Sequence, residues 1–116
     1  MEAYHLFASI PVAEIGAATR WYGNLAGRPP DLVPNESEAA WRVAGESGWI
    51  YLIADPDRAG SGLSTLLVDD LDALLAQIGE RGVAAGPVET LAGGSVRRAT
   101  ITDPDGNRLN VGQAQT

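Results

Sequence analysis

Apolar and polar positions along this chain follow two periods, and the order of these periods repeats once. Residues 4–12 alternate loosely between apolar and polar side chains, which is typical of a strand. From about Ala13 to Leu25 the apolar positions recur at helical spacing, and Gly27 with the prolines after it predicts the end of that helix. The strands expected in this half lie at 4–12, 38–44 and 48–54, with a short edge strand near 31–34.

A polar stretch rich in turn residues, 55–62, separates this half from a second half with the same order of patterns. The clearest amphipathic helix of the chain is predicted at 69–81, because four apolar residues share one face there and Gly82 follows. Acidic residues crowd its first turn, where the positive end of the helix dipole favours them. The strands expected in this half lie at 63–68, 84–89, 96–102 and 107–112, with a turn at 93–95.

The two halves match each other at an offset of 56 residues, at which Val12 aligns with Val68 and Gly23 with Gly79. Each half is predicted to form one helix on a small sheet, a unit that buries too little apolar surface to be stable alone. We therefore expect one α+β domain over 1–116, built from two βαβββ modules in tandem at about 1–57 and 58–116. Two curved sheets of this kind would leave a trough between them.

Composition narrows the chemistry that such a domain can perform. The 116 residues include no cysteine, which excludes disulfides, thiolate metal ligands and a cysteine nucleophile. All eight basic residues are arginine, so Schiff-base chemistry on lysine is also excluded. The net charge of −7 would repel a nucleic-acid backbone and would weakly attract a cationic small molecule.

The start of the chain and its apolar runs indicate where the protein works. The N-terminal residues lack the basic and apolar regions of a signal peptide. No apolar run approaches the ~20 residues that a membrane span needs. We therefore expect a cytoplasmic protein with no nucleic-acid partner and no membrane partner.

Three motifs carry a resemblance to a known family. The run DPDGN at 103–107 makes a turn between two predicted strands. Trp21 and Tyr22 near the end of the first helix are followed by a glycine and then prolines, and the run VDDL at 68–71 opens the second helix. Together with the repeat, these motifs resemble the vicinal oxygen chelate superfamily, which includes glyoxalases, bleomycin-resistance proteins and extradiol dioxygenases. The resemblance implies a trough-forming fold, but that fold hosts both enzymes and binding proteins.

In metal-dependent members of that superfamily, His, Glu or Gln ligands sit on inward positions of four strands. The resemblance places those positions at Phe7, about Tyr51, Leu63 and Asn110. Phenylalanine and leucine offer no ligand atom, and a lone asparagine is a poor anchor for a transition metal. The single histidine, His5, has no second histidine or suitably placed glutamate to join it. We therefore expect no metal, no other cofactor and no assigned catalytic residue, while an acid–base role for His5 near Tyr51 stays open.

Strand alternation gives a set of side chains that would line the trough around those positions. The neighbours Arg97 and Arg98 must face opposite sides of their strand, and we expect Arg98 to face inward. There it needs an anion from the ligand or from an acid such as Glu38. Trp41 is included although alternation alone does not fix which side of its strand it faces. The expected ligand-binding residues are Phe7, Ser9, Trp41, Trp49, Tyr51, Leu63, Thr65, Arg98, Thr100 and Asn110.

An aromatic wall with a few polar groups is typical of a pocket for an organic ligand. The sequence therefore favours a metal-free binding protein, similar to the bleomycin-resistance group, that sequesters an antibiotic or other natural product. The expected ligand is flat and carries positive charge or mixed polarity. Two alternatives remain: an enzyme of the same superfamily, such as a lyase, isomerase or dioxygenase, and a regulatory or partner-binding module. A homodimer is also expected, because paired chains would cover open sheet edges.

Overall fold

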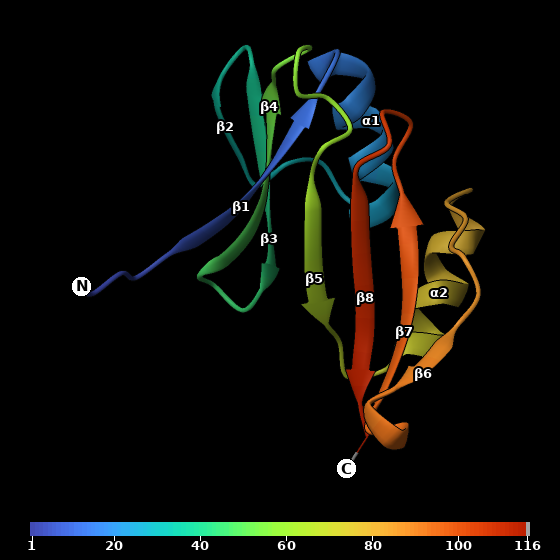
Figure 1. Cartoon of the computed structure of the whole chain (residues 1–116). Coiled ribbons are helices and arrows are strands. Elements are labelled where there is room, and N and C mark those ends of the chain that lie inside the picture. The colour runs from blue at the N-terminus through green and yellow to red at the C-terminus, as the bar shows by residue number, and fades with distance from the viewer. Residues whose placement is uncertain (116) are drawn as a thin grey trace.

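The structure, a computed structural model, describes residues 1–115 and contains two successive βαβββ modules (Figure 1). The α+β class and the tandem repeat expected from the sequence are confirmed. The first module consists of β1 (Leu6–Val12), α1 (Ile15–Ala26), β2 (Leu32–Asn35), β3 (Glu38–Ala44) and β4 (Gly48–Ala54). The second consists of β5 (Leu63–Leu67), α2 (Leu71–Glu80), β6 (Glu89–Leu91), a short 3₁₀ turn (Ala92–Gly94), β7 (Val96–Thr102) and β8 (Arg108–Ala114). Neither α-helix within residues 1–115 is long and apolar enough to cross a membrane.

Both sheets have the same strand order, in which the first strand of the module pairs with the last. The orders are β1-β4-β3-β2 and β5-β8-β7-β6, with β1–β4 and β5–β8 parallel and the other pairs antiparallel. The long connection from the first strand to the last, which includes the helix, makes this parallel pairing possible. As a result, β1 and β5 are edge strands, and their outer edges have no neighbouring strand among residues 1–115.

Each helix begins directly after an acidic residue that caps it. Glu14 accepts hydrogen bonds from the backbone amides of Ala17 and, at 3.0 Å, of Gly16, and these bonds lower the pKa of its carboxyl. Asp70 accepts a bond from the amide of Ala73 at 3.0 Å. The two caps lie 56 residues apart, at the offset of the sequence repeat. Because the capping residues stand outside the helices, both helices start two residues later than predicted.

The strand predictions hold in the centre of each sheet and fail at one edge. β3, β4 and β7 have the predicted bounds, whereas β1 starts at Leu6 rather than at residue 4. The short strand predicted at 84–89 is wrong in position, because β6 covers Glu89–Leu91. In the preceding segment the amide of Gly86 donates to the carbonyl of Thr100 at 2.9 Å. The continuous ladder with β7 begins only at Glu89, so this single bond does not make the apolar residues before it a strand.

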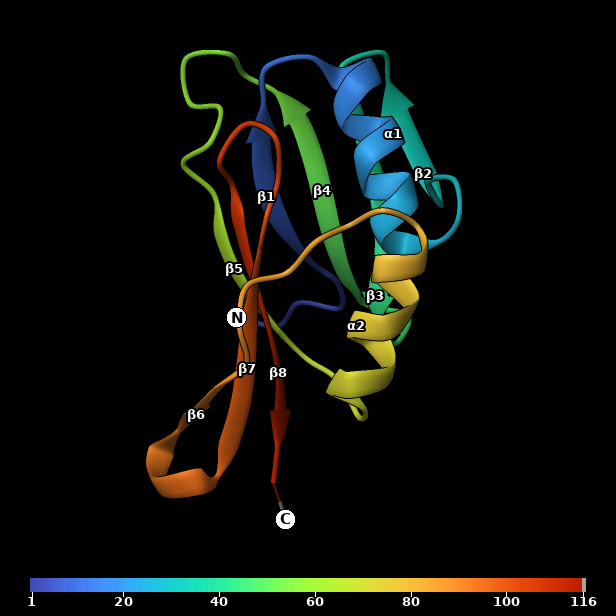
Figure 2. The same cartoon turned by 90° about the vertical axis from the view of Figure 1, so that its right-hand side faces the viewer.

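The two modules pack on each other through their helix-covered faces. One buried cluster lies between α1 and its sheet, and the other lies between α2 and its sheet. Trp21 and Leu25 of α1 and Leu66 of β5 pack against both clusters, and Leu109 of β8 belongs to the cluster of the first module. Each helix therefore covers the inner side of its own sheet, and the end of α1 meets the end of α2 (Figures 1 and 2). The helix-free face of each sheet, called its open face below, is turned outward.

The DPDGN turn at 103–107 joins the two modules. Asp103 is buried and accepts hydrogen bonds from the Tyr22 hydroxyl at 2.8 Å and from backbone amides of its own turn. Asn107, also buried, donates to the carbonyl of Pro11 at 2.7 Å and accepts from the amide of Gly62 at 2.7 Å. Burial and the negative charge of Asp103 raise the pKa of Tyr22 well above its ordinary value. The turn therefore connects β8 with β1, α1 and the linker.

Candidate functional site

The open face of the first sheet carries a cluster of aromatic side chains. β1 and β4 run parallel with Phe7 beside Trp49 and Ser9 beside Tyr51, so these four side chains share one face. The Phe7 and Trp49 rings stack with their centroids 5.0 Å apart and 20° between their planes. Tyr51 meets Phe7 edge-on at 5.8 Å. The expected shared face agrees with this register, while a role of these side chains in binding stays a prediction.

Trp49 forms the back of this cluster rather than its surface. Its side chain is only 6% exposed, because Phe7 covers one part of the ring and the Arg42 guanidinium lies 4.7 Å from the ring centroid. The indole N–H donates to Nδ1 of His5 at 2.9 Å. His5 is thereby bound to Trp49 and not to Tyr51. A ligand on this face would touch Phe7 and Tyr51 first, with Trp49 behind them.

A hollow of about 320 Å³ lies over this aromatic cluster. It is lined by Phe7, Ser9, Leu32, Pro34, Glu38 and Tyr51. The carboxylate of Glu38 accepts hydrogen bonds from the Tyr51 hydroxyl and from Nδ2 of Asn35 at 2.6 Å. Within residues 1–115, no arginine forms an ion pair with Glu38. The hollow therefore combines aromatic faces with a negative charge that no cation of the described chain neutralises.

Alternation along β3 decides which of its residues reach the hollow. Ala40 stands opposite Tyr51, so Glu38 and Ala40 face the open side, whereas Trp41 faces α1. Trp41 is fully buried, and its indole N–H donates to a backbone carbonyl of the loop after α1 at 3.0 Å. The prediction that Trp41 lines the trough is therefore wrong, because this residue belongs to the core. Glu38, considered from sequence only as a partner for Arg98, was the residue missed, and the same alternation could have found it.

The remaining expected residues lie on the open face of the second sheet. The register across β5, β8 and β7 puts Thr65, Asn110 and Thr100 in one row. The Thr100 hydroxyl donates to Oδ1 of Asn110 at 2.8 Å. Leu63 and Leu67 lie two residues before and after Thr65, on the same face of β5, and both are exposed at the free edge of the sheet. This face is therefore polar in its middle and apolar along its outer strand.

Arg97 and Arg98 face opposite sides of β7, as their positions require. Arg97 reaches α2 and pairs with Asp72 at 3.0 Å, and this hydrogen-bonded partner lowers the pKa of the Asp72 carboxyl. Arg98 lies on the open side, 3.6 Å from Glu89, its neighbour across the ladder. Its Nε atom is buried and makes no hydrogen bond within residues 1–115. The acid beside Arg98 is therefore Glu89. Glu38, which the sequence suggested as a partner, lies on the other sheet.

The two sets of expected residues do not meet within one chain. The hollow over the first sheet is lined by residues of the first module alone. The two sheets stand at an angle to each other, with a helix on the inner side of each, so the two open faces point in different directions (Figures 1 and 2). One chain thus presents an acidic, aromatic surface and, separately, a polar surface that contains Arg98.

Comparison with known proteins decides the family. A family model for the glyoxalase/bleomycin resistance protein/dioxygenase superfamily matches residues 5–111, nearly the whole chain. The chain belongs to this superfamily. Among curated proteins, no significant match to this chain was found.

Solved structures of other superfamily members resemble this chain over its full length. A glyoxalase/bleomycin resistance protein from Catenulispora acidiphila DSM 44928 is 42% identical, with a TM-score of 0.89 over 97% of this chain and 100% of that one. TnmS3, an antibiotic binding protein from Streptomyces sp. CB03234, is 27% identical, with a TM-score of 0.78 over 98% of each chain. A bleomycin-binding protein complexed with bleomycin is 19% identical, with a TM-score of 0.75 over 99% of each chain, and this likeness shows the fold alone.

The positions that carry metal ligands in metal-dependent superfamily members do not fit an ion here. Phe7 and Tyr51 lie on the first open face, and Leu63 and Asn110 lie on the second. Their side chains offer one hydroxyl and one amide, a poor donor set for a divalent transition metal. Within residues 1–115, no group of three or more His, Asp or Glu side chains is placed to hold a metal ion. No step of a metal-dependent reaction can be derived from these residues.

Proposed function

We propose that this superfamily member is a metal-free binding protein that holds a flat organic molecule, such as an antibiotic, without transforming it. The observation that carries the proposal is the hollow in which Phe7 and Tyr51 stand beside the carboxylate of Glu38. Aromatic rings offer faces for stacking, and the carboxylate offers a partner for a cationic or hydrogen-bond-donating group. A planar ligand that carries positive charge or mixed polarity matches these groups.

The energetics require that the ligand bury apolar surface on both of its faces. Micromolar affinity needs about 8 kcal/mol. A stacked aromatic pair contributes about 0.5–1.5 kcal/mol, and a favourable cation–π contact contributes about as much. The hollow of about 320 Å³ lies at the small end of the range of roughly 300–1,000 Å³ for drug-sized ligands. A ligand held against one sheet alone would leave its second face in water.

The proposal therefore includes a homodimer in which the second sheet of one chain covers the first sheet of its partner. The free outer edges of β1 and β5 can pair between chains, and such pairing would cover the exposed Leu63 and Leu67. Arg98, Thr100 and Asn110 of one chain would then face the aromatic hollow of the other. Two-fold symmetry would give two composite sites per dimer.

Similar proteins support the proposed class of ligand. TnmS3, which is 27% identical to this chain, is described as an antibiotic binding protein. A more distant protein with the same fold has been solved with bleomycin bound. The first description agrees with a site for an antibiotic, and the second shows that a protein of this fold can hold an organic ligand.

Titration with a panel of planar antibiotics tests the ligand. Trp49 stacks behind Phe7, so a ligand that docks on Phe7 should change tryptophan fluorescence, while calorimetry measures the affinity independently. Phe7→Ala should weaken binding by up to about tenfold, because it removes the exposed ring. Trp49→Phe should remove most of the optical signal and keep the calorimetric binding. If the wild type binds no member of the panel, or if Phe7→Ala binds as tightly, the proposed face is wrong.

Mixing variant chains tests the composite site. A homodimer of Phe7→Ala chains and a homodimer of Arg98→Ala chains each carry a defect in both sites. If sites are shared, chain exchange produces a heterodimer with one intact site and one doubly altered site, so tight binding should reappear on mixing. Sedimentation at micromolar concentration should show dimers. A monomer, or no recovery on mixing, would refute the shared site.

Two further parts of the proposal are separately measurable. Elemental analysis should find no stoichiometric Zn, Ni, Mn or Fe, and a bound ligand should be recovered chemically unchanged. About one tightly held ion per chain, or a converted ligand, would favour the enzymes of the superfamily instead. A cytoplasmic location also belongs to the proposal and is checked by cell fractionation.

A further inference from the structure

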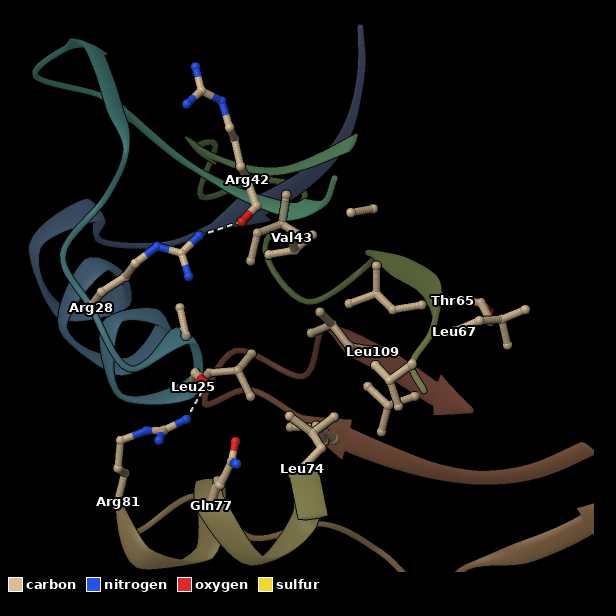
Figure 3. Close-up of a pocket in the computed structure, with 17 residues that line it drawn as sticks. Leu25, Arg28, Arg42, Val43, Thr65, Leu67, Leu74, Gln77, Arg81 and Leu109 are labelled. Atoms are coloured by element: carbon tan, nitrogen blue, oxygen red, sulfur yellow. Dashed lines mark hydrogen bonds between the residues drawn. The ribbon is translucent and has the colours of Figure 1, made fainter. Parts of the chain in front are cut away.

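A second cavity, distinct from the proposed site, lies between the two modules on their helix-covered side. Its volume is about 360 Å³, and residues from both modules line it. Its apolar walls include Leu25, Ile50, Leu66, Leu74, Leu109 and Val111. Thr65, which lies in the row with Asn110 and Thr100, also borders this inter-module cavity (Figure 3). None of the residues that line the hollow over the first sheet takes part in it.

The charged residues around the inter-module cavity are all basic. Of the eight arginines in the chain, Arg28, Arg42 and Arg81 line it, together with the amide of Gln77. No aspartate or glutamate lines it, although acidic residues outnumber basic ones 15 to 8 in the chain. The side chain of Arg42 points away from the cavity (Figure 3), toward the ring of Trp49. Arg28 and Arg81 therefore provide the local positive charge.

Arg81 is held at the cavity by its own contacts. Its Nε donates to the carbonyl of Asn24 at 2.5 Å, and its Nη2 donates to the carbonyl of Leu25 at 2.9 Å. Gly27 makes room for the guanidinium, because a Cβ atom there would lie 3.1 Å from Cζ of Arg81. Within residues 1–115, its Nη1 donates to no acceptor and no carboxylate pairs with it. Two donors are thus used for positioning, and one side of the guanidinium stays available.

Arg28 differs from Arg81 because its charge is already matched. Its Nη2 lies 2.9 Å from a carboxylate oxygen of Asp31 and also donates to the carbonyl of Arg42. These contacts tie the loop after α1 to β3 at the rim of the cavity. Arg81 is therefore the guanidinium to which a new anion would bind.

We propose that the inter-module cavity binds an amphipathic organic monoanion, with its apolar part between the modules and its carboxylate on Arg81. An apolar interior with one fixed cation at its mouth complements such a molecule in both shape and charge. A cation of the same shape is repelled by Arg81 and finds no acidic partner in the lining. The preference is opposite to that of the aromatic hollow, where Glu38 favours a positive charge. This second site depends on neither the antibiotic nor the dimer proposed above.

Calorimetry with octanoate, octanol and octyltrimethylammonium tests the proposal, since the three probes share one tail and differ in charge. Octanoate should bind the wild type at least about tenfold more tightly than either of the other two. Gln77→Glu, an isosteric change at an exposed position of α2, should weaken octanoate binding about fivefold to tenfold, and Gln77→Lys should strengthen it. Ala76→Glu is the matched control, because it adds the same charge one residue away, outside the lining, and should change the affinity little.

Amide chemical shifts locate the binding event. Octanoate should perturb the end of α1 and the face of α2 near Gln77, and Phe7→Ala should leave its affinity unchanged. Equal binding of all three probes, equal effects of Gln77→Glu and Ala76→Glu, or perturbation confined to the open faces would overturn the proposal. So would an octanoate affinity that falls as the protein concentration rises, because a second copy of the chain would then occupy the cavity.

Discussion

The two open faces of this protein share one strand order and have opposite chemistry. The first presents Phe7 and Tyr51 beside the acidic Glu38. The second presents Thr100, Asn110 and the basic Arg98 in a sheet of the same topology. The helix caps and the parallel pairing repeat because they determine the fold. The open faces are free of that constraint, so their side chains can differ, and the proposed binding function makes use of this difference.

The cores of the two modules differ in a related way. In the first module, Tyr22 and Trp41 are fully buried between α1 and its sheet. The fully buried side chains in the cluster of the second module, such as Leu71, Ile78 and Ile101, are aliphatic. The first module thus obtains much of its buried area from two large rings, one of which also bonds to the joint at Asp103.

The largest expected effect comes from breaking the aromatic core of the first module. Trp41→Ala should lower the free energy of unfolding by about 3–5 kcal/mol, because it removes a fully buried ring and leaves a cavity. The matched change in the second module, Ile101→Ala, should cost about 2–5 kcal/mol. Denaturant unfolding measures both. If Trp41→Ala proves clearly cheaper than Ile101→Ala, the first module does not depend on its aromatic core.

The next effect concerns the joint between the modules. Asp103→Ala should cost about 1–3 kcal/mol, because the Tyr22 hydroxyl and the Asn107 side chain lose a buried acceptor. Thermal unfolding gives the size, and hydrogen exchange should show faster opening where β8 meets α1. Asp105→Ala removes a bond to the amide of Ala13 at an exposed site and serves as the milder control. Equal costs for the two variants would contradict the role given to Asp103.

Alkaline pH should weaken the same joint. The unfolded chain releases the Tyr22 proton near pH 10, whereas the folded chain retains it because burial and Asp103 raise this pKa. The folded state then binds more protons, so stability falls as pH rises above about 10, by up to about 1.4 kcal/mol per pH unit from this group. Tyr22→Phe should lose this part of the slope. A pH dependence unchanged in Tyr22→Phe would refute the assignment.

A smaller effect separates the two open faces by charge. Glu38→Gln should weaken binding of a cationic planar ligand by about fivefold to tenfold, as expected for one ion pair of about 1 kcal/mol near water. Binding of a neutral ligand of the same shape should change little. Calorimetry on both ligands provides the comparison. Equal losses for the charged and neutral ligands would mean that Glu38 acts only through its bond with Tyr51.

The smallest effect tests the orientation of the arginine pair on β7. The hydrogen bonds from Arg97 hold the pKa of Asp72 below the ordinary value of about 3.9. Arg97→Gln should return this pKa toward that value, whereas Arg98→Gln, on the other face of the strand, should leave it unchanged. Carboxyl chemical shifts followed through an acid titration measure it. A shift caused equally by both variants would show that the two arginines are not separated by the sheet.

Local patterns predicted the elements but not all of the site. Alternation placed Phe7, Ser9 and Tyr51 on one face correctly, because side chains of neighbouring strands share a face at matched register. The prediction for Trp41 was wrong, because only the pairing of β3 with β4 fixes which side of the sheet this residue faces. Its large aromatic side chain favoured a binding role when the sequence alone was considered. The binding role of the other expected residues remains a prediction.

The amino-acid sequence by itself determined the repeat, the element order, the helix caps and the turn at 103–107, since periodicity, capping and turn geometry act between residues close along the chain. Only the tertiary structure decided that the ends of α1 and α2 meet and that the two open faces point in different directions. It also decided that Arg98 meets Glu89 and that Arg81 lines a cavity between the modules. These features depend on packing between residues far apart in the sequence, and no local pattern encodes the angle at which two modules meet.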